Sequence, residues 1–143
     1  MTVRIGIAMF MTIAFLSSNL LSQNANLAGN WSVEAPAASG ENYQLGPQSG
    51  LLTLNLNGDE VTGTWKGRMP EPWKLTGRAK ENTFELQTET RNLPATRDGE
   101  QTTVPRHWIF RGSVGGDELT GTMSLAGGGG VEPTQAFSAA RKR

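Results

Sequence analysis

Few side chains of this 143-residue sequence are suited to enzymatic chemistry, since it has no cysteine and one histidine, His107. An active site needs a nucleophile with a base, a pair of tuned carboxylates or a metal site. His107 lies between Arg106 and Trp108, on the strand face opposite Trp108, so we expect it to face solvent. A zinc site here would depend on carboxylates for nearly all its ligands, which is atypical. The sequence therefore predicts neither catalytic residues nor a metal site.

The carboxylates are also explained without catalysis. Glu85 and Glu89 share the outward face of one predicted strand, which is typical of a solvated charged face. Asp59 and Asp117 each follow a glycine in the repeated sequence GDE, where turn chemistry accounts for an aspartate. The glycine run AGGGG at 126–130 precedes Val-Glu-Pro and no helix, so a flexible loop explains it better than a phosphate-binding loop. We expect a non-catalytic protein without a cofactor.

Aromatic side chains are the remaining candidates for a functional site. Trp65 ends one predicted strand, Trp73 begins the next, and Trp108 enters from the same end, all on the apolar face. An apolar pocket is one interpretation, because ligand sites are concave and lined with aromatic residues. A packed core is the other, because side chains can just fill an eight-stranded barrel. The candidate ligand-binding residues are Trp65, Trp73, Trp108, Phe110 and Met123.

The elements that would position these residues are hairpins built on a repeated phrase. GDEVTGTW at 58–65 returns as GDELTGTM at 116–123, and KLTGR at 74–78 is a shorter copy. Apolar and polar residues alternate on both sides of each turn, as in half-buried strands. In each hairpin a glycine falls on the apolar face in mid-strand, which indicates a sharp bend or a close backbone approach. These glycines are Gly63, Gly77 and Gly121.

Eight strands are predicted in all, with tight turns and longer loops alternating between them. The strands are at about 30–35, 50–56, 60–67, 73–79, 82–90, 103–114, 117–125 and 134–141. The longer loops are PAASGENYQLGPQS, RMPEP, RNLPATRDGEQT and AGGGGVEP. Alternate connections of an up-and-down meander lie at opposite ends, so all four long loops would project from one end. The expected fold is an all-β, eight-stranded antiparallel up-and-down β-barrel after an N-terminal signal peptide.

The first 25 residues have the order of a secretory signal peptide. One early cation, Arg4, precedes an apolar run over 5–16 and then small polar residues. The run is shorter than the roughly 18–20 residues of a membrane span, and a buried helix or an uncleaved anchor is the alternative. We expect a signal peptide at 1–25, a barrel domain at 28–142, a secreted or periplasmic location and no membrane contact after cleavage.

The charge of the sequence argues against two classes of partner. Without Arg4, 12 of the 13 Lys and Arg residues remain against 13 Asp and Glu, and no long basic block precedes the terminal RKR. Nucleic acid and anionic membranes are therefore not expected partners.

Without disulfides, a mature chain of about 120 residues must be stabilised by its core alone, which is feasible at that size.

The two ends of the predicted barrel resemble calycins, the group that contains the lipocalins and avidins. LAGNWSVE opens the first strand and FSAARKR closes the last, so Gly29, Trp31 and Arg141 match the glycine, tryptophan and arginine of that signature. The resemblance implies a structural role, with Trp31 at the closed end and Arg141 packed across it. The chain lacks the cysteines and the helix that lipocalins usually have. It is also similar to a recurrent module of bacterial exported proteins, to which no chemistry is assigned.

Two hypotheses for function follow. The first is an exported, non-catalytic binding module that takes a small, partly apolar ligand at the long-loop mouth of the barrel. The alternative is a structural or protein-interaction domain whose core is filled with side chains. Trp65, Trp73 and Trp108 distinguish the two, because their fluorescence would respond to a ligand only if it reaches them.

Overall fold

The computed structural model describes residues 27–40, 43–128 and 133–143, and this part of the chain is built from strands. The strands are β1 (Gly29–Ala35), β2 (Ala38–Gly40), β3 (Tyr43–Leu45), β4 (Gln48–Asn57), β5 (Glu60–Lys66), β6 (Trp73–Lys80), β7 (Thr83–Thr88), β8 (Arg91–Arg97), β9 (Glu100–Gly115), β10 (Glu118–Ala126) and β11 (Thr134–Arg141). The predicted signal peptide lies outside the described residues. No helix among the described residues is long and apolar enough to cross a membrane.

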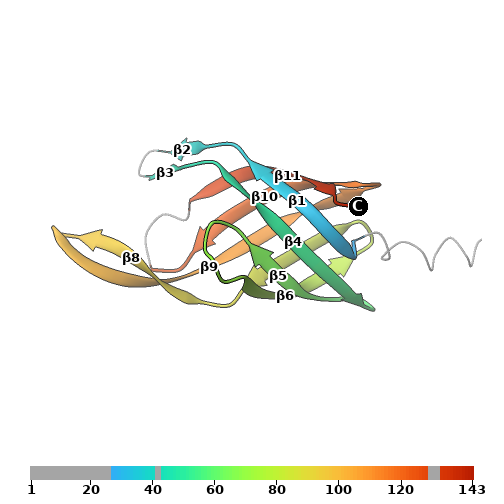
Figure 1. Ribbon diagram of the computed structural model, residues 1–143, viewed down its shortest axis with the longest axis horizontal. Helices are drawn as coiled ribbons and strands as arrows, with labels where there is room; N and C mark the ends of the chain where they lie inside the picture. The colour runs from blue at the N-terminus through green and yellow to red at the C-terminus, as the bar shows by residue number, and fades with distance from the viewer. Residues whose placement is uncertain (1–26, 41–42, 129–132) are drawn as a thin grey trace, which may run out of the picture.

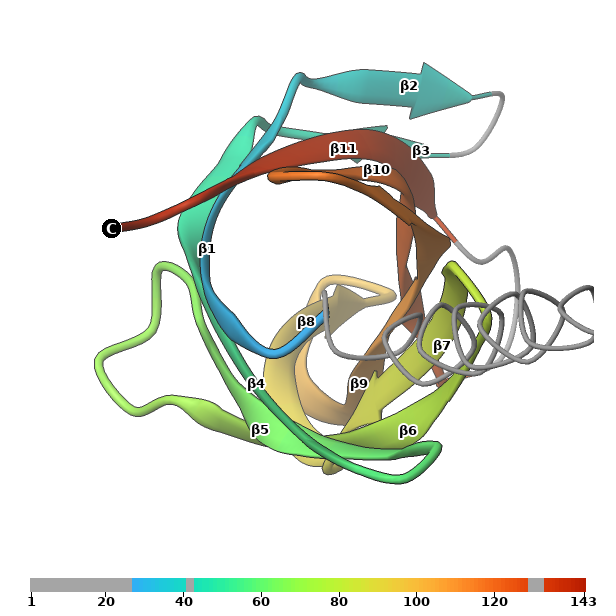
Figure 2. The same cartoon turned by 90° about the vertical axis from the view of Figure 1, so that its right-hand side faces the viewer.

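Eight of these strands close into an antiparallel barrel (Figure 1, Figure 2). Neighbouring strands follow the order β1, β4, β5, β6, β7, β9, β10 and β11, and β11 pairs with β1 to complete the ring. Spatial order follows chain order, as in an up-and-down meander. The predicted fold class is confirmed, and each predicted strand corresponds to a barrel strand.

The repeated phrase GDE builds the same junction twice. In both copies the turn glycine has a positive φ, 65° and 64°. The backbone carbonyl of Asp59 then accepts a hydrogen bond from the N–H of Ala79 at 2.9 Å. In the second copy the carbonyl of Asp117 accepts one from the N–H of Arg141, also at 2.9 Å. Each copy therefore turns the chain and hydrogen bonds to the end of a neighbouring strand.

The mid-strand glycines mark close backbone approaches, as predicted. A Cβ atom would lie 1.8 Å from a backbone oxygen of the adjacent strand at Gly63, 2.2 Å at Gly77 and 2.0 Å at Gly121. Real Cβ atoms do not come this close to an oxygen, so only glycine fits. Glycines at such positions are typical of strongly coiled sheets that close on themselves.

Two of the predicted long loops contain strands, so their assignment as loops is wrong. Residues 38–40 and 43–45 form the small β2–β3 hairpin, and β8 pairs with the first half of β9 to form a projecting two-stranded ribbon. At the ribbon's turn, Asp98 and Gly99 have φ values of 54° and 80°, the two positive values that a two-residue type I′ hairpin requires. The Asp-Gly pair was therefore a hairpin signal, which Pro94 and Pro105 obscured because prolines interrupt strand patterns. Both hairpins lie at the end opposite the tight turns (Figure 1).

Candidate functional site

The five predicted ligand-binding residues lie close together inside the barrel, but they are buried. Trp65, Phe110 and Met123 are at most 1% exposed, Trp73 is 2% exposed and Trp108 is 7% exposed. Trp65 pairs directly with Trp73 across β5 and β6, and Met123 pairs with Phe110 across β10 and β9. The sequence therefore placed these residues on the correct face of their strands.

Ring contacts show that this cluster is packed as a core. The ring of Phe110 lies 5.3 Å from that of Trp65 and 5.7 Å from that of Phe137, both edge-to-face. Such pairs contribute about 0.5–1.5 kcal/mol each beyond the burial of their area. Leu125 packs against the same core from β10. Phe110 thus contacts Trp65 and Phe137, and all five candidate residues belong to the buried hydrophobic core.

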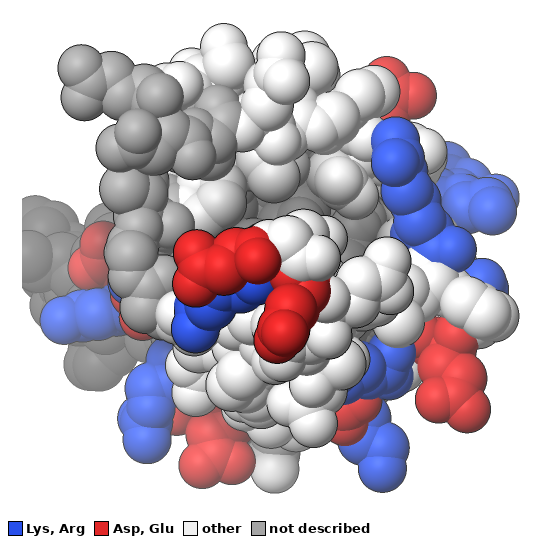
Figure 3. All heavy atoms as spheres, turned by 90° about the vertical axis from the view of Figure 1, so that its left-hand side faces the viewer, with Lys and Arg blue, Asp and Glu red and all other residues white. Residues whose placement is uncertain are grey.

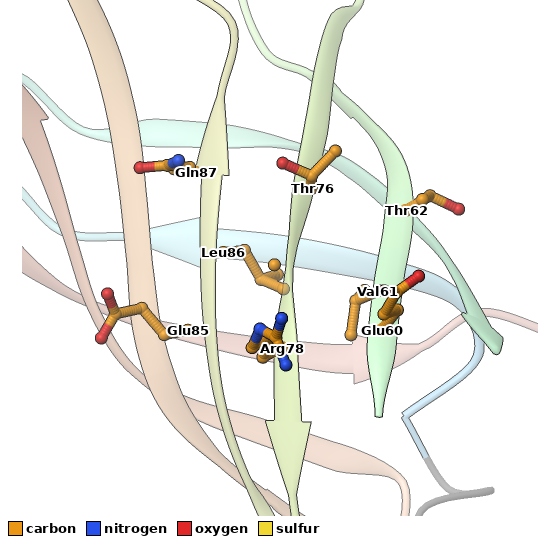
Figure 4. A pocket seen from close by; sticks show the side chains of 9 residues that line it. Glu60, Val61, Thr62, Thr76, Arg78, Glu85, Leu86 and Gln87 are labelled. Atoms are coloured by element: carbon orange, nitrogen blue, oxygen red, sulfur yellow. The ribbon is translucent and has the colours of Figure 1, made fainter. Parts of the chain in front are cut away.

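Several open hollows lie on the outer surface of the described residues. One of them, about 700 Å³, is a groove across β5, β6 and β7. Figure 4 shows its walls, which are two rows of polar side chains on either side of the Val61 and Leu86 backbone. One row is Thr62, Thr76 and Gln87, and the other is Glu60, Arg78 and Glu85. This groove is not lined by any of the five predicted residues.

At the closed end, the expected contact between Arg141 and Trp31 is present. The Arg141 guanidinium lies 4.2 Å from the centre of the Trp31 ring. Its Nη1 atom donates a hydrogen bond to the carbonyl of Ala28 at 2.7 Å, and its Nε atom donates to Asp117 at 2.9 Å. The indole nitrogen of Trp31 donates to the carbonyl of Leu27 at 2.9 Å. Both side chains are therefore fixed in orientation.

Gly29, the third residue of the calycin-like signature, lies against this stack. Its φ is 132°, and a Cβ atom there would lie 2.9 Å from Nη1 of Arg141. A side chain at this position would be strained and would press on the guanidinium. The structure thus brings Gly29, Trp31 and Arg141 together at the end that carries the tight turns.

We expect the carboxylate of Asp117 to give the stability of the closed end a dependence on pH. Hydrogen bonds from Arg143 and then from Arg141 hold the pKa of Asp117 below its ordinary value. Because the folded pKa is lower than the unfolded one, the stabilisation is present at neutral pH and is lost as pH falls through the acid range. We expect Asp117→Asn to lower the free energy of unfolding at pH 7, and the difference from wild type to shrink on acidification. Urea titrations at a series of pH values measure this difference.

Asp59 is the matched control, since it occupies the same place in the first copy of the repeat. Its carboxylate forms an ion pair of 3.7 Å with Arg78, whose side chain is 75% exposed, whereas the Arg141 side chain that binds Asp117 is 22% exposed. Exposed pairs of this kind contribute little. Asp59→Asn should therefore change stability less than Asp117→Asn, and equal effects at every pH would contradict the assignment.

Sequence reasoning missed a second stack of arginine on tryptophan, at the hairpin end. The Arg91 guanidinium lies 4.5 Å from the centre of the Trp73 ring. It donates hydrogen bonds to the carbonyls of Pro72 at 2.6 Å and Glu71 at 3.1 Å, and to the Glu89 carboxylate at 3.0 Å. Arg91 thereby covers Trp73 and ties the β5–β6 loop to the start of β8. No local pattern predicts this contact, because Arg91 is 18 positions from Trp73 and stands in a segment interpreted as loop.

We expect Arg91→Ala to loosen the hairpin end. The stack itself is worth about 0.5–2 kcal/mol, and the freed carbonyls add to the loss. Trp73 would gain exposure to water, so tryptophan emission should shift to longer wavelength while the unfolding midpoint falls. Arg91→Lys should recover part of the stability, because it keeps the charge but not the planar fork. An unchanged emission spectrum in Arg91→Ala would contradict the assignment.

Gln135 is a further buried polar residue that the sequence did not reveal. Its Nε2 atom donates to the carbonyls of Pro36 at 3.1 Å and Gly46 at 3.2 Å, which flank the β2–β3 hairpin. Its Oε1 atom is buried and has no hydrogen-bond partner among the described residues. Gln135 thus fastens the base of β2–β3 to β11.

The remaining residues with potential chemistry are dispersed. His107 is half-buried, on the face of β9 opposite the buried Trp108. Glu85 pairs with Arg111 at 3.2 Å and Glu89 with Arg91 at 2.9 Å. Within the described ranges, no three His, Asp or Glu side chains gather in a way that could hold a metal ion.

Comparisons with known proteins add no family. No protein-family model, no curated protein and no solved structure matches the chain. The resemblance to calycins therefore stays a prediction, and the candidate site is described by its own geometry.

Proposed function

We propose that this chain is a non-catalytic binding module with a solid core, and that it contacts a protein partner through the end from which β2–β3 and β8–β9 project. Of the two sequence-based hypotheses, this is the protein-interaction alternative. The observation that supports it is the burial of Trp65, Trp73 and Trp108 in the hydrophobic core, where Arg91 covers the Trp73 ring at the hairpin end. A ligand would have to displace core side chains to reach these indoles, which close packing opposes.

The exposed side chains indicate which kind of interface with a protein partner we expect. Met69, 38% exposed, is the one large apolar side chain that is exposed among the described residues. An extensive apolar interface is therefore unsupported, and we expect a contact made largely by polar groups. The ribbon tip carries Arg97, Asp98 and Glu100, all exposed. Figure 3 looks onto this end, where charged side chains of both signs gather near the middle, with uncharged residues around them and further charged side chains along the rim.

Site-specific photocrosslinking tests the proposal. A photoreactive amino acid at Thr96, on the exposed ribbon, should give a discrete crosslinked product in the cells that naturally produce the protein. The same residue at Thr76, exposed on the side of the barrel, is the matched control and should give none. Native mass spectrometry of the purified protein provides the second measurement. A small molecule retained on the barrel, without a ribbon-specific crosslink, would favour the small-ligand hypothesis and overturn this one.

A further inference from the structure

The β8–β9 ribbon has a free edge where a second copy of the chain could add a strand. Among the described strands, β8 pairs with β9 alone, whereas every barrel strand has neighbours on both sides. The ribbon projects from the barrel, so no other part of the described fold lies along β8 as a strand (Figure 1). An exposed edge of this kind is a template for pairing with another chain.

The register shows which backbone groups point outward from β8. Pro94 is opposite Thr103, and Asn92 is opposite Pro105. Because proline has no N–H to give to a ladder, both pairs must be of the kind that does not exchange hydrogen bonds. The backbone groups of Asn92, Pro94 and Thr96 therefore face the free edge.

The same alternation is supported from β9. The N–H of Trp108 donates to the side chain of Thr88 at 2.8 Å. The backbone N–H and C=O groups of the even-numbered residues of β9 therefore point toward the side of β7 and β8. Thr103 and Pro105 then point away from β8, as the proline argument requires. Two independent observations thus agree on the free edge.

The other edge of the ribbon is approached by the chain itself. The β9–β10 ladder ends where His107 pairs with Ala126. The next residue of β9 that would donate a backbone N–H to this edge is Pro105, which has none. Gly127 then lies against Pro105, since a Cβ atom on Gly127 would be 2.5 Å from the Pro105 carbonyl oxygen. This close approach occupies the edge of β9 next to the barrel. The free edge of β8 is not covered by another described strand, and it carries Pro94 instead.

We propose that Pro94 closes the free edge of β8 to strand addition by a second copy of this chain. Pro94 is the middle one of the three positions whose backbone groups face outward. The two remaining N–H donors, on Asn92 and Thr96, are therefore separated by a position without a donor. Two copies of β8 would meet edge to edge about a two-fold axis, where the two Pro94 residues remove one donor from each half of the new ladder. The inference is independent of the proposed function, because it concerns self-association of the ribbon and no other partner.

Restoring the missing donor tests the proposal. Pro94→Thr adds an N–H and places a polar side chain on the exposed face. We expect sedimentation velocity to show reversible dimers or larger species for Pro94→Thr at concentrations where wild type is a single monomeric species. The β-type circular dichroism spectrum should be unchanged. A second substitution, Thr96→Pro, removes a neighbouring outward donor and should return the Pro94→Thr chain to a monomer.

Thr96→Val is the matched control, because it makes the same face more apolar without changing any backbone donor. It should remain monomeric. The proposal would be overturned if folded Pro94→Thr stayed monomeric. It would also be overturned if Thr96→Val associated to the same extent, or if only unfolded Pro94→Thr associated. Pro94→Ala, which restores the N–H with the smallest side chain, keeps the test available should threonine disturb the ribbon.

Discussion

Replacing Trp31 with alanine should lower the free energy of unfolding by about 3–5 kcal/mol, the usual cost of deleting a buried tryptophan. Trp31 is fully buried at the closed end, and its indole nitrogen is hydrogen bonded to Leu27. The substitution removes the ring that Arg141 covers, and it leaves a void that strands paired on both sides cannot fill by moving. Urea unfolding followed by circular dichroism measures the change.

The matched variant is Trp31→Phe, which keeps an aromatic face under Arg141 but loses the hydrogen bond to Leu27. It should cost less than Trp31→Ala, and the contribution of Arg141 should remain detectable in a double-mutant cycle. If Trp31→Ala left the unfolding midpoint unchanged, the assignment of Trp31 to the closure of the barrel would be wrong. The circular dichroism spectrum of the folded variant should stay β-type, since the other hairpins do not depend on this ring.

Gly63→Ala should be the second large effect, although it adds a single methyl group. The new Cβ would lie 1.8 Å from the carbonyl oxygen of Thr53, in the strand paired with it. The clash is with backbone, so no side-chain rotation relieves it and β4 and β5 must separate. Overpacking of this kind costs about 1–3 kcal/mol, and a fixed backbone contact places this change toward the upper end. Thermal or urea unfolding measures it.

Gly115→Ala is the control for the Gly63 substitution. Gly115 is also a strand residue, but it is exposed and a Cβ atom there would meet nothing within 4 Å. Its substitution should change stability by less than about 0.5 kcal/mol, as surface changes usually do. Equal losses at Gly63 and Gly115 would show that glycine is needed for its backbone freedom in general. A loss confined to Gly63 would support the close approach of β4 and β5.

The sequence by itself determined the barrel strands, their order and the closed end. Alternation of period two around Leu52, Leu54 and Leu56 identifies a strand face without any tertiary information. Tight turns such as the one at 57–59 then force neighbouring strands to pair, so a run of hairpins specifies a meander. The contact of Trp31 with Arg141 follows from that topology, because the first strand begins where the last one ends.

Tertiary structure alone decided how the inward aromatic residues are used and what the long connections become. Whether Trp65, Trp73 and Trp108 line a pocket or fill a core depends on the summed volume of side chains from strands far apart in sequence, which no local pattern contains. The stack of Arg91 on Trp73 likewise joins segments that become neighbours only when the barrel closes. The β8–β9 ribbon depends on pairing along β9, which extends beyond the barrel and so gives a proline-containing segment a partner strand.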